Sequence, residues 1–225
     1  MSEVAELQFD PLGDQAVLVH AADEATALAF AAAVRREQLA WVEDVVQAYT
    51  SVAVFYRAEA TDYFQAKQYL AKLDWQNLGS NSTGKLHVVP CCYDLGVDFE
   101  RVSQHTGLTR EQIIAAHSAA IYTVYAIGFC PGFPYLGYLP ENLTGVPRLE
   151  TPRLKVEAGS VGLTGRQTGI YTEARPGGWN ILGRTPLELV NVAGGYFPIR
   201  TGDRVQFQAI DENEFRKTLG QRLAI

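Results

Sequence analysis

The sequence has few cysteines, no long apolar run and no excess of positive charge. Its three cysteines are an odd number, and Cys91 and Cys92 are adjacent, which is not the pattern of a disulfide framework. Reduced thiols in a cytoplasmic protein are therefore the simpler expectation. No run of roughly 18 apolar residues occurs, so no membrane span is expected. The opening residues MSEVAELQFDPLGD lack the basic and apolar regions of a signal peptide.

The balance of charge argues against nucleic acid as a partner. The chain has 19 Lys and Arg against 25 Asp and Glu, a net charge of −6, whereas proteins that bind nucleic acid usually carry a basic patch. The four histidines are scattered without HxH or HExxH spacing, so no metal site is expected. Neither a Walker A motif nor a GxGxxG between a strand and a helix is present. A nucleotide would be handled without these devices or by a partner chain.

The first part of the chain predicts a small α+β domain. With 225 residues, 47% of them hydrophobic, the protein can form one large or two small globular domains. Alternation of apolar residues and helix-forming composition predict the order ββ-α-ββ-α. The expected elements are strands at 7–9, 16–20, 41–49 and 51–57 and helices at 24–38 and 62–73, the second helix capped by Thr61.

A domain boundary is expected in the segment 77-NLGSNSTG-84. The segment has no charge and is rich in Asn, Ser and Gly, which is typical of a linker. Residues 1–80 are therefore expected to form the N-terminal α+β domain, and residues 81–225 a second domain.

The second domain predicts a β barrel. Between residues 128 and 202, short apolar runs are separated by Gly and Pro at near-regular spacing, which is typical of a closed or nearly closed barrel. The predicted fold class is α+β. The other expected elements are strands at 85–93, 120–129 and 203–210, a short helix from Asp98, a helix with a capping box from Thr109, and a helix at 212–219.

Arginine and glycine are concentrated in one segment, 148-RLETPRLKVEAGSVGLTGRQTGIYTEARPGGWNILGRTP-186. Glycine lets the backbone turn sharply and approach a ligand closely. The guanidinium fork of arginine binds carboxylate or phosphate at two points. The segment therefore favours an anion-binding surface on a β scaffold, and turn glycines with surface arginines are the alternative.

Three single residues are candidates for chemistry. Cys130 could be a nucleophile paired with His117, although a free cysteine is more often a small buried hydrophobe. His117 could be a base, or a packed and hydrogen-bonded histidine. Asp14 could be a positioned carboxylate, or a turn-former that bonds its own backbone.

The stretch 127-IGFCPGFPYLGYLP-140 contains no charge and is rich in Gly, Pro and aromatic residues. Its prolines exclude a helix interior and lower the cost of ordering the loop. An exposed rigid aromatic loop would form a pocket wall or a partner interface. The alternative is a buried loop that covers one end of the barrel.

These motifs resemble the KipI/PxpB family, also called allophanate hydrolase subunit 1. The resemblance rests on GFCPGFPYLGYLP, PRLETPR, AGSVGLTGRQTGIY and PGGWNILGRTP, with GDRVQF near 202–207 and weaker matches such as 13-GDQAVLV-19. It implies an N-terminal α+β domain and a C-terminal cyclophilin-like β barrel.

The resemblance also implies an enzyme. It suggests one subunit of a bacterial 5-oxoprolinase, which opens the lactam of pyroglutamate to give glutamate at the expense of ATP, with Mg²⁺. The implied partners are a PxpC (KipA-like) subunit and a PxpA (LamB/YcsF-like) subunit. Some relatives are described instead as inhibitors of a histidine kinase, and the module is also similar to part of urea carboxylase, so a kinase-binding protein and a urea or allophanate subunit are the alternatives.

The expected site combines this chemistry with the arginine and glycine segment. Activation of an amide by ATP needs cations directed at phosphate oxygens and a clamp for the substrate carboxylate. His117 and Asp14 are secondary candidates for catalysis. The residues expected to line one ligand cleft are Arg148, Arg153, Arg166, Gln167, Thr168, Tyr171 and Arg184.

Overall fold

The computed structural model describes residues 7–75 and 84–223. Its backbone contacts divide the chain into two compact units, the first ending at Thr83 and the second beginning at Gly84. The predicted boundary between residues 80 and 81 lies outside the described residues, as does all but the last residue of the expected linker.

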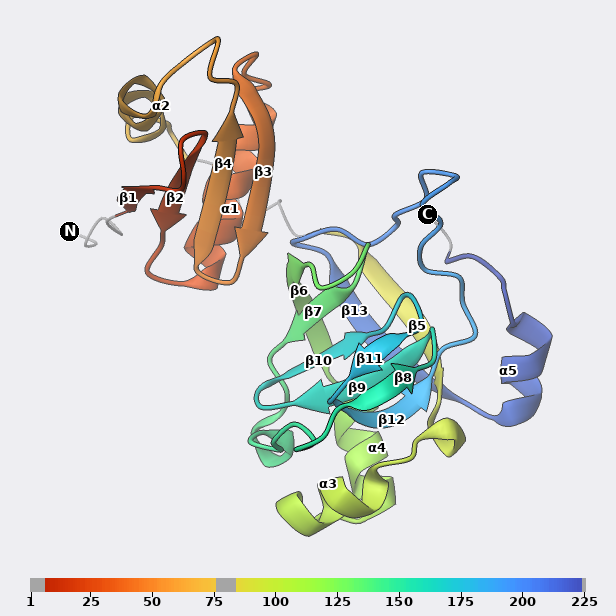
Figure 1. The fold of residues 1–225 in the computed structure, drawn as a ribbon. Helices are drawn as coiled ribbons and strands as arrows, with labels where there is room; N and C mark the ends of the chain where they lie inside the picture. Colours follow the sequence, from red (N-terminus) through yellow and green to blue (C-terminus); the bar gives the residue numbers. More distant parts are fainter. Residues whose placement is uncertain (1–6, 76–83, 224–225) are drawn as a thin grey trace. The chain divides into compact units, whose positions relative to one another are not determined.

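Within residues 7–75, the N-terminal unit is an antiparallel sheet with two helices. The strands pair in the order β1-β2-β4-β3, and α1 lies against the sheet (Figure 1). The observed element order confirms the predicted ββ-α-ββ-α pattern. The bounds are β1 (Gln8–Pro11), β2 (Ala16–His20), α1 (Glu24–Arg36), β3 (Val42–Ala48), β4 (Ser51–Tyr56) and α2 (Tyr63–Leu70).

Side-chain caps fix where the two helices of this unit begin. The carboxylate of Asp23 accepts a hydrogen bond of 2.7 Å from the backbone N–H of Thr26 at the start of α1. Asp62, not Thr61 as predicted, caps α2, because its carboxylate accepts from the Gln65 N–H at 2.9 Å. Asp and Thr are both good N-cap residues, so their order in the sequence did not decide between them.

The second unit contains the remaining elements of the described chain. Two single 3₁₀ turns, Tyr93–Leu95 and Glu141–Leu143, separate some of them. The bounds are β5 (Leu86–Cys92), α3 (Phe99–Thr106), α4 (Arg110–Ala119), β6 (Ile121–Ile127), β7 (Pro134–Gly137), β8 (Arg153–Val156), β9 (Ser160–Thr164), β10 (Gln167–Ile170), β11 (Arg175–Gly177), β12 (Asn180–Arg184), β13 (Arg204–Ile210) and α5 (Glu212–Thr218).

Seven of these strands close into a barrel. They follow the order β6-β13-β5-β12-β9-β10-β7, and β7 pairs back with β6. All neighbours are antiparallel except β5 and β13, which run parallel. This closed sheet confirms the predicted barrel and the α+β fold class. Strands β8 and β11 form a separate two-stranded ribbon outside it.

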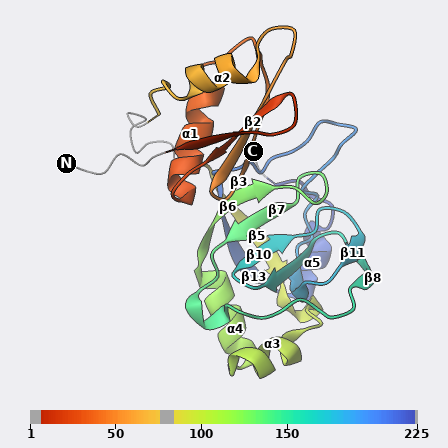
Figure 2. The ribbon, with the colours of Figure 1, turned by 60° about the vertical axis from the view of Figure 1, so that its left-hand side comes forward.

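Helices cover only part of the barrel. Helices α3 and α4 lie together at one end in both views, and α5 lies beside β5 (Figures 1 and 2). Inside, the alternation of β6 buries Tyr122 and Val124 and leaves Ile121 exposed. Among the described residues, no helix is both long enough and apolar enough to cross a membrane.

The adjacent cysteines of β5 lie on opposite faces of the strand, as predicted. Cys91 packs inside the barrel, whereas Cys92 packs with Ile210 and Phe215 beneath α5. Burial raises the pKa of the Cys91 thiol far above its usual range. Because the thiolate is the reactive form, Cys91 is an inert core residue.

Removal of the α4 cap should destabilise the barrel unit. The predicted capping box is present: Thr109 accepts from the Gln112 N–H, and the Gln112 side chain accepts from the Thr109 N–H. We expect Thr109→Ala to lower the free energy of unfolding by about 1 kcal/mol, measured by urea denaturation. Thr109→Ser keeps the accepting oxygen and should stay close to wild type, and an equal loss in both variants would contradict the capping role.

Candidate functional site

The charge-free stretch 127–140 is not a loop throughout, because its residues Pro134–Gly137 form strand β7. The stretch contains both buried and exposed residues. Phe133 and Leu136 are almost completely buried, whereas the side chain of Phe129 is 58% exposed. Phe129 also has a φ of 65°, in the left-handed region that bulky residues rarely occupy. Both interpretations of the sequence therefore hold for different residues: most of the loop covers the barrel, and Phe129 stands at its surface.

Aromatic rings from three parts of the chain meet beneath this loop. Phe133 makes edge contacts with Tyr135, Tyr171 and Trp179, with ring centroids 4.9, 5.3 and 5.4 Å away. Edge-to-face packing of this kind stabilises a cluster beyond simple burial of area. The charge-free stretch supplies the rings of Phe133 and Tyr135. Tyr171 directly follows β10, and Trp179 directly precedes β12.

A cavity of about 310 Å³ opens beside this cluster, and we name it the aromatic cavity. Arg148 is the one charged residue in its lining. The volume lies at the lower end of the usual range for small-molecule pockets. The residues that line it are Phe129, Phe133, Tyr135, Arg148, Pro152, Tyr171, Pro176, Gly177, Gly178 and Trp179.

The charge of Arg148 acts on two phenols in the aromatic cavity. Burial raises the pKa of Tyr135, and the positive charge of Arg148 opposes this rise. Burial also raises the pKa of Tyr171, opposed by a backbone hydrogen bond from Trp179 and by the charges of Arg148 and Arg153. Both hydroxyls therefore stay protonated at neutral pH, and the charge of Arg148 acts on both.

Glycines allow the walls of the aromatic cavity to meet. A Cβ on Gly177 would lie 2.3 Å from the Tyr171 hydroxyl, and one on Gly169 would lie 2.9 Å from the Trp179 ring. No other residue fits at these positions without moving the aromatic side chains. The glycines of the segment 148–186 thus serve close packing around the site, one of the roles that the sequence suggested.

A second hollow, which we name the β8 groove, has a volume of about 340 Å³. It contains three cations, each of which already has a partner. Arg153 pairs with Asp98 at 2.6 Å, and Lys155 with Glu157 at 2.8 Å. Arg184 donates from Nε to the carbonyl of Ala158 at 2.7 Å. Its lining residues are Leu95, Val97, Arg153, Lys155, Val156, Glu157, Ser160, Ile181 and Arg184.

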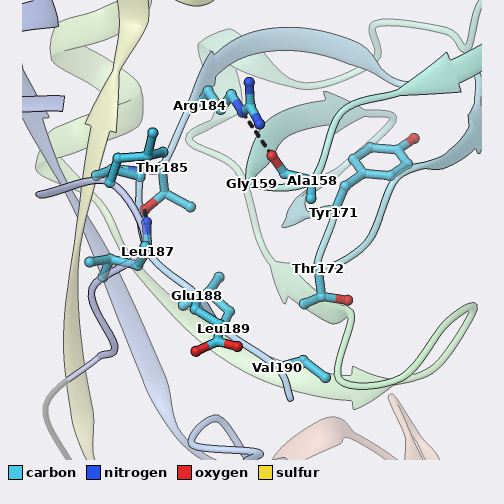
Figure 3. A pocket seen from close by; sticks show the side chains of 13 residues that line it. Ala158, Gly159, Tyr171, Thr172, Arg184, Thr185, Leu187, Glu188, Leu189 and Val190 are labelled. Carbon is cyan, nitrogen blue, oxygen red and sulfur yellow. Dashed lines mark hydrogen bonds between the residues drawn. The ribbon is translucent and has the colours of Figure 1, made fainter. Parts of the chain in front are cut away.

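A third hollow of about 230 Å³ lies between β12, the segment after it and the end of β10 (Figure 3). Tyr171 and Thr172 form one side, and the chain from Thr185 to Val190 forms the other. Arg184 reaches across the top of this view to Ala158. The carboxylate of Glu188 is bonded to Arg222 at 2.7 Å and to Asn191 at 2.8 Å.

The structure divides the predicted cleft residues among several places. Arg148 and Tyr171 line the aromatic cavity, whereas Arg153 and Arg184 line the β8 groove. Arg166 lines none of the three hollows, since its guanidinium stacks on the ring of Tyr138 at 4.2 Å. None of these three hollows, all within the described residues, is lined by all four arginines, and ligand binding by each remains a prediction.

Gln167 and Thr168 lie in β10 and also line none of the three hollows. Thr168 is completely buried. Its hydroxyl donates to the carbonyl of Gly162 at 2.9 Å and is 3.0 Å from His117 Nε2.

His117 lies within the barrel rather than at a ligand site. Because the Thr168 proton goes to Gly162, Nε2 of His117 must carry a hydrogen and donate to Thr168. The other ring nitrogen, Nδ1, then accepts from the Tyr93 hydroxyl at 2.7 Å. Burial lowers the pKa of His117 to about 3. The ring is completely buried and stacks on Phe207, which supports the packing alternative, and a role as catalytic base remains a prediction.

The other two candidates for chemistry, Asp14 and Cys130, lie in different units of the chain. Asp14 is exposed in the N-terminal unit, where its backbone carbonyl accepts from the Tyr56 hydroxyl at 3.0 Å. Cys130 is buried, and its sulfur is 3.4 Å from the Thr172 hydroxyl. Within the described chain, no hydrogen bond joins Cys130 to His117. A role for Asp14 in catalysis remains a prediction.

Most residues of the aromatic cavity were not among the predicted site residues, which included only Arg148 and Tyr171 of its lining. Tyr135 and Trp179 both form walls of the cavity. The signals were present in the sequence, since Tyr135 belongs to the charge-free loop and Trp179 follows two glycines. Only the fold brings these two motifs, more than 40 residues apart, into contact.

The described residues do not form a metal site made of protein ligands alone, and a nucleotide site remains a prediction. No group of three His, Cys, Asp or Glu side chains among them could hold a metal ion. The three cations of the β8 groove are each bonded within the chain, whereas a triphosphate needs cations and backbone N–H groups directed at it.

The fold and cavities define a class: an α+β protein whose closed barrel carries small-ligand hollows beside an external β ribbon. The chain belongs to the family described as carboxyltransferase domain, subdomain C and D, which matches residues 7–194. It is 31% identical to a Bacillus subtilis protein named as a subunit of 5-oxoprolinase, over 92% of this chain and 95% of that protein. It is 40% identical to the Haemophilus influenzae protein of the same name, over 80% and 84%. These relatives confirm the resemblance found in the sequence.

Solved structures show the same fold. The crystal structure of TTHA0988 matches with a TM-score of 0.77 and 32% identity, covering 88% of this chain and 40% of that one. This chain therefore spans less than half the length of TTHA0988. The urea carboxylase of Kluyveromyces lactis, at 14% identity and a TM-score of 0.67, shares the fold alone.

Proposed function

We propose that this chain is one subunit of an ATP-dependent 5-oxoprolinase, a cyclic amide hydrolase that converts 5-oxoproline (pyroglutamate) to glutamate. The observation that carries the proposal is the match, along most of both chains, to proteins named as 5-oxoprolinase subunits. The word subunit in these names supports a multi-subunit enzyme. The partners proposed are a KipA-like and a LamB/YcsF-like subunit, and the site of action is the cytoplasm.

The steps of the proposed reaction can be assigned to different subunits. The lactam carbonyl is stabilised by resonance, and ATP can activate it as an acyl phosphate. In the described part of this chain the three cations of the β8 groove are bonded within the chain, so we place the nucleotide on a partner. What this chain offers is a free guanidinium among aromatic rings in the aromatic cavity, which suits a substrate that has one carboxylate and one small ring.

Reconstitution of the complex tests the proposed function. The three purified subunits should release glutamate from 5-oxoproline only when ATP is present, and omission of this chain should abolish turnover. Full turnover without this chain, or no turnover by the complete mixture with ATP and Mg²⁺, would contradict the proposal.

A urea or allophanate pathway is the second candidate, because the family is named for a carboxyltransferase domain. A carboxyltransferase of this kind would act on a carboxylated biotin group supplied by a partner. Transfer of labelled bicarbonate to urea, in a mixture of this chain with a biotin-dependent carboxylase, would favour this candidate. Glutamate release from 5-oxoproline would favour the first.

A further inference from the structure

Arg148 is an exposed cation without an anion. Among the described residues no carboxylate lies within 4 Å of its guanidinium, and its side chain makes no hydrogen bond to them. Its backbone carbonyl, by contrast, accepts from Arg101 at 3.3 Å. Of the other predicted arginines, Arg153 is neutralised by a buried carboxylate and Arg184 is bonded to a carbonyl. Arg148 is therefore the free cation of the aromatic cavity.

The surroundings of Arg148 select for a particular kind of anion. The walls are aromatic, and the hydroxyls of Tyr135 and Tyr171 lie close enough to Arg148 for its charge to act on both. Phosphate groups of a nucleotide would meet a single cation and apolar rings. A single carboxylate on a small flat ring matches one guanidinium, two hydroxyl groups and apolar walls.

The aromatic cavity is also built rather than incidental. Trp179 and Phe133 are fixed by edge contacts and are almost completely buried, and Gly169 and Gly177 leave room for them. Phe129 is held at the rim with its unusual backbone angle, a feature that clusters at ligand sites. Preorganised walls of this kind lower the cost of binding.

We propose that the aromatic cavity binds 5-oxoproline, with its carboxylate on Arg148 and its lactam ring against Phe133 and Trp179. This inference rests on the proposed function and adds to it that the substrate first binds on this subunit. The hydroxyl of Tyr135, a residue less buried than Tyr171, is available to the lactam carbonyl. Arg148 is a substrate-binding residue in this arrangement, and the aromatic rings exclude water from the lactam.

The test is fluorine NMR of the full chain labelled with fluorotryptophan. The chain has 3 tryptophans, of which only Trp179 belongs to the second unit, so Trp179→Phe identifies its resonance. Titration with 5-oxoproline should shift the Trp179 resonance to saturation and leave the other two unchanged. 2-Pyrrolidinone, which is the same ring without the carboxylate, should bind about 10- to 100-fold more weakly, as expected for loss of a charge-assisted hydrogen bond.

Variants of Arg148 assign the carboxylate contact. Arg148→Gln should weaken the binding of 5-oxoproline about 10- to 100-fold and leave the binding of 2-pyrrolidinone unchanged. Arg148→Lys should restore part of the lost affinity. Arg216→Gln is the matched control, because Arg216 is exposed on α5, pairs with Glu212 and lines none of the three hollows. Equal weakening of both ligands by Arg148→Gln, or no shift of Trp179 with 5-oxoproline, would overturn the inference.

The reconstituted complex separates this inference from the proposed function. Both hold if the complex turns over 5-oxoproline and Arg148→Gln raises KM much more than it lowers kcat. Turnover with an unchanged KM in Arg148→Gln would overturn the binding site and leave the function standing. No turnover by a complete complex whose Trp179 still responds to 5-oxoproline would overturn the function and leave the site.

Discussion

Asp98→Ala should destabilise the barrel unit by about 3 kcal/mol, because it removes one partner of a largely buried ion pair and leaves a backbone donor unpaired. The Asp98 side chain is 8% exposed and lies 2.6 Å from the Arg153 guanidinium. Its second oxygen accepts from the buried N–H of Ile181, also at 2.6 Å. Arg153 is 31% exposed, so water recovers part of its loss, which keeps the effect below the largest values known for buried pairs.

The consequences of this change extend to the ligand hollows. Arg153 is the first residue of β8 and lines the β8 groove, and its neighbour Pro152 lines the aromatic cavity. Arg153 also donates to the carbonyl of Trp179 at 3.4 Å. Loss of Asp98 should therefore loosen the ribbon and weaken the proposed binding of 5-oxoproline as well as reduce stability.

Urea denaturation, followed by the fluorine resonance of Trp179, measures the second unit separately. The control is Asp94→Ala, which removes an exposed pair with Arg110 of similar length, 2.7 Å. Exposed pairs contribute about 0–1 kcal/mol, so this variant should stay close to wild type. Equal effects of the two substitutions would show that burial of Asp98 does not determine its contribution.

The elements of this fold could be predicted because their signals are local. The capping box of Thr109 and Gln112 lies within four residues, and the alternation of β6 and β13 is visible in the sequence. The sequence predicted a closed or nearly closed barrel, but not the order of its strands. Which strands pair, including the parallel pair of β5 and β13, depends on contacts between residues more than 100 positions apart.

From the sequence, the candidate site could be predicted only as a segment rich in arginine and glycine. The sequence shows arginines among glycines but not which of them are already neutralised. Asp98 lies 55 residues before Arg153 and neutralises its guanidinium. No local sequence pattern predicts this pairing. The same limit applies to His117, whose partners Tyr93 and Thr168 come from opposite sides of it in the sequence. What local patterns did capture was the charge-free aromatic loop, which supplies part of the cavity wall.

The buried His117 should also make the barrel unit sensitive to acid. Its pKa falls from 6.5 to about 3 through burial, so the unfolded chain binds a proton between these values that the folded chain does not. The stability of the folded state is therefore complete above about pH 6.5 and decreases as the pH falls. The loss through this single group is about 1.4 kcal/mol per pH unit, or roughly 3 kcal/mol between pH 6.5 and 4.5.

A non-titrating replacement isolates this contribution. His117→Gln should be less stable than wild type at pH 7, because the hydrogen bonds to Tyr93 and Thr168 are disturbed, but its free energy of unfolding should fall less steeply toward pH 4.5. The control is Ile113→Val, a completely buried residue of the same helix, which should cost about 1 kcal/mol and keep the wild-type slope. Urea titrations at several pH values, again followed through Trp179, give the three slopes. If His117→Gln keeps the wild-type slope, the histidine takes up a proton within the folded barrel, and its enclosure is looser than the distances to Tyr93 and Thr168 indicate.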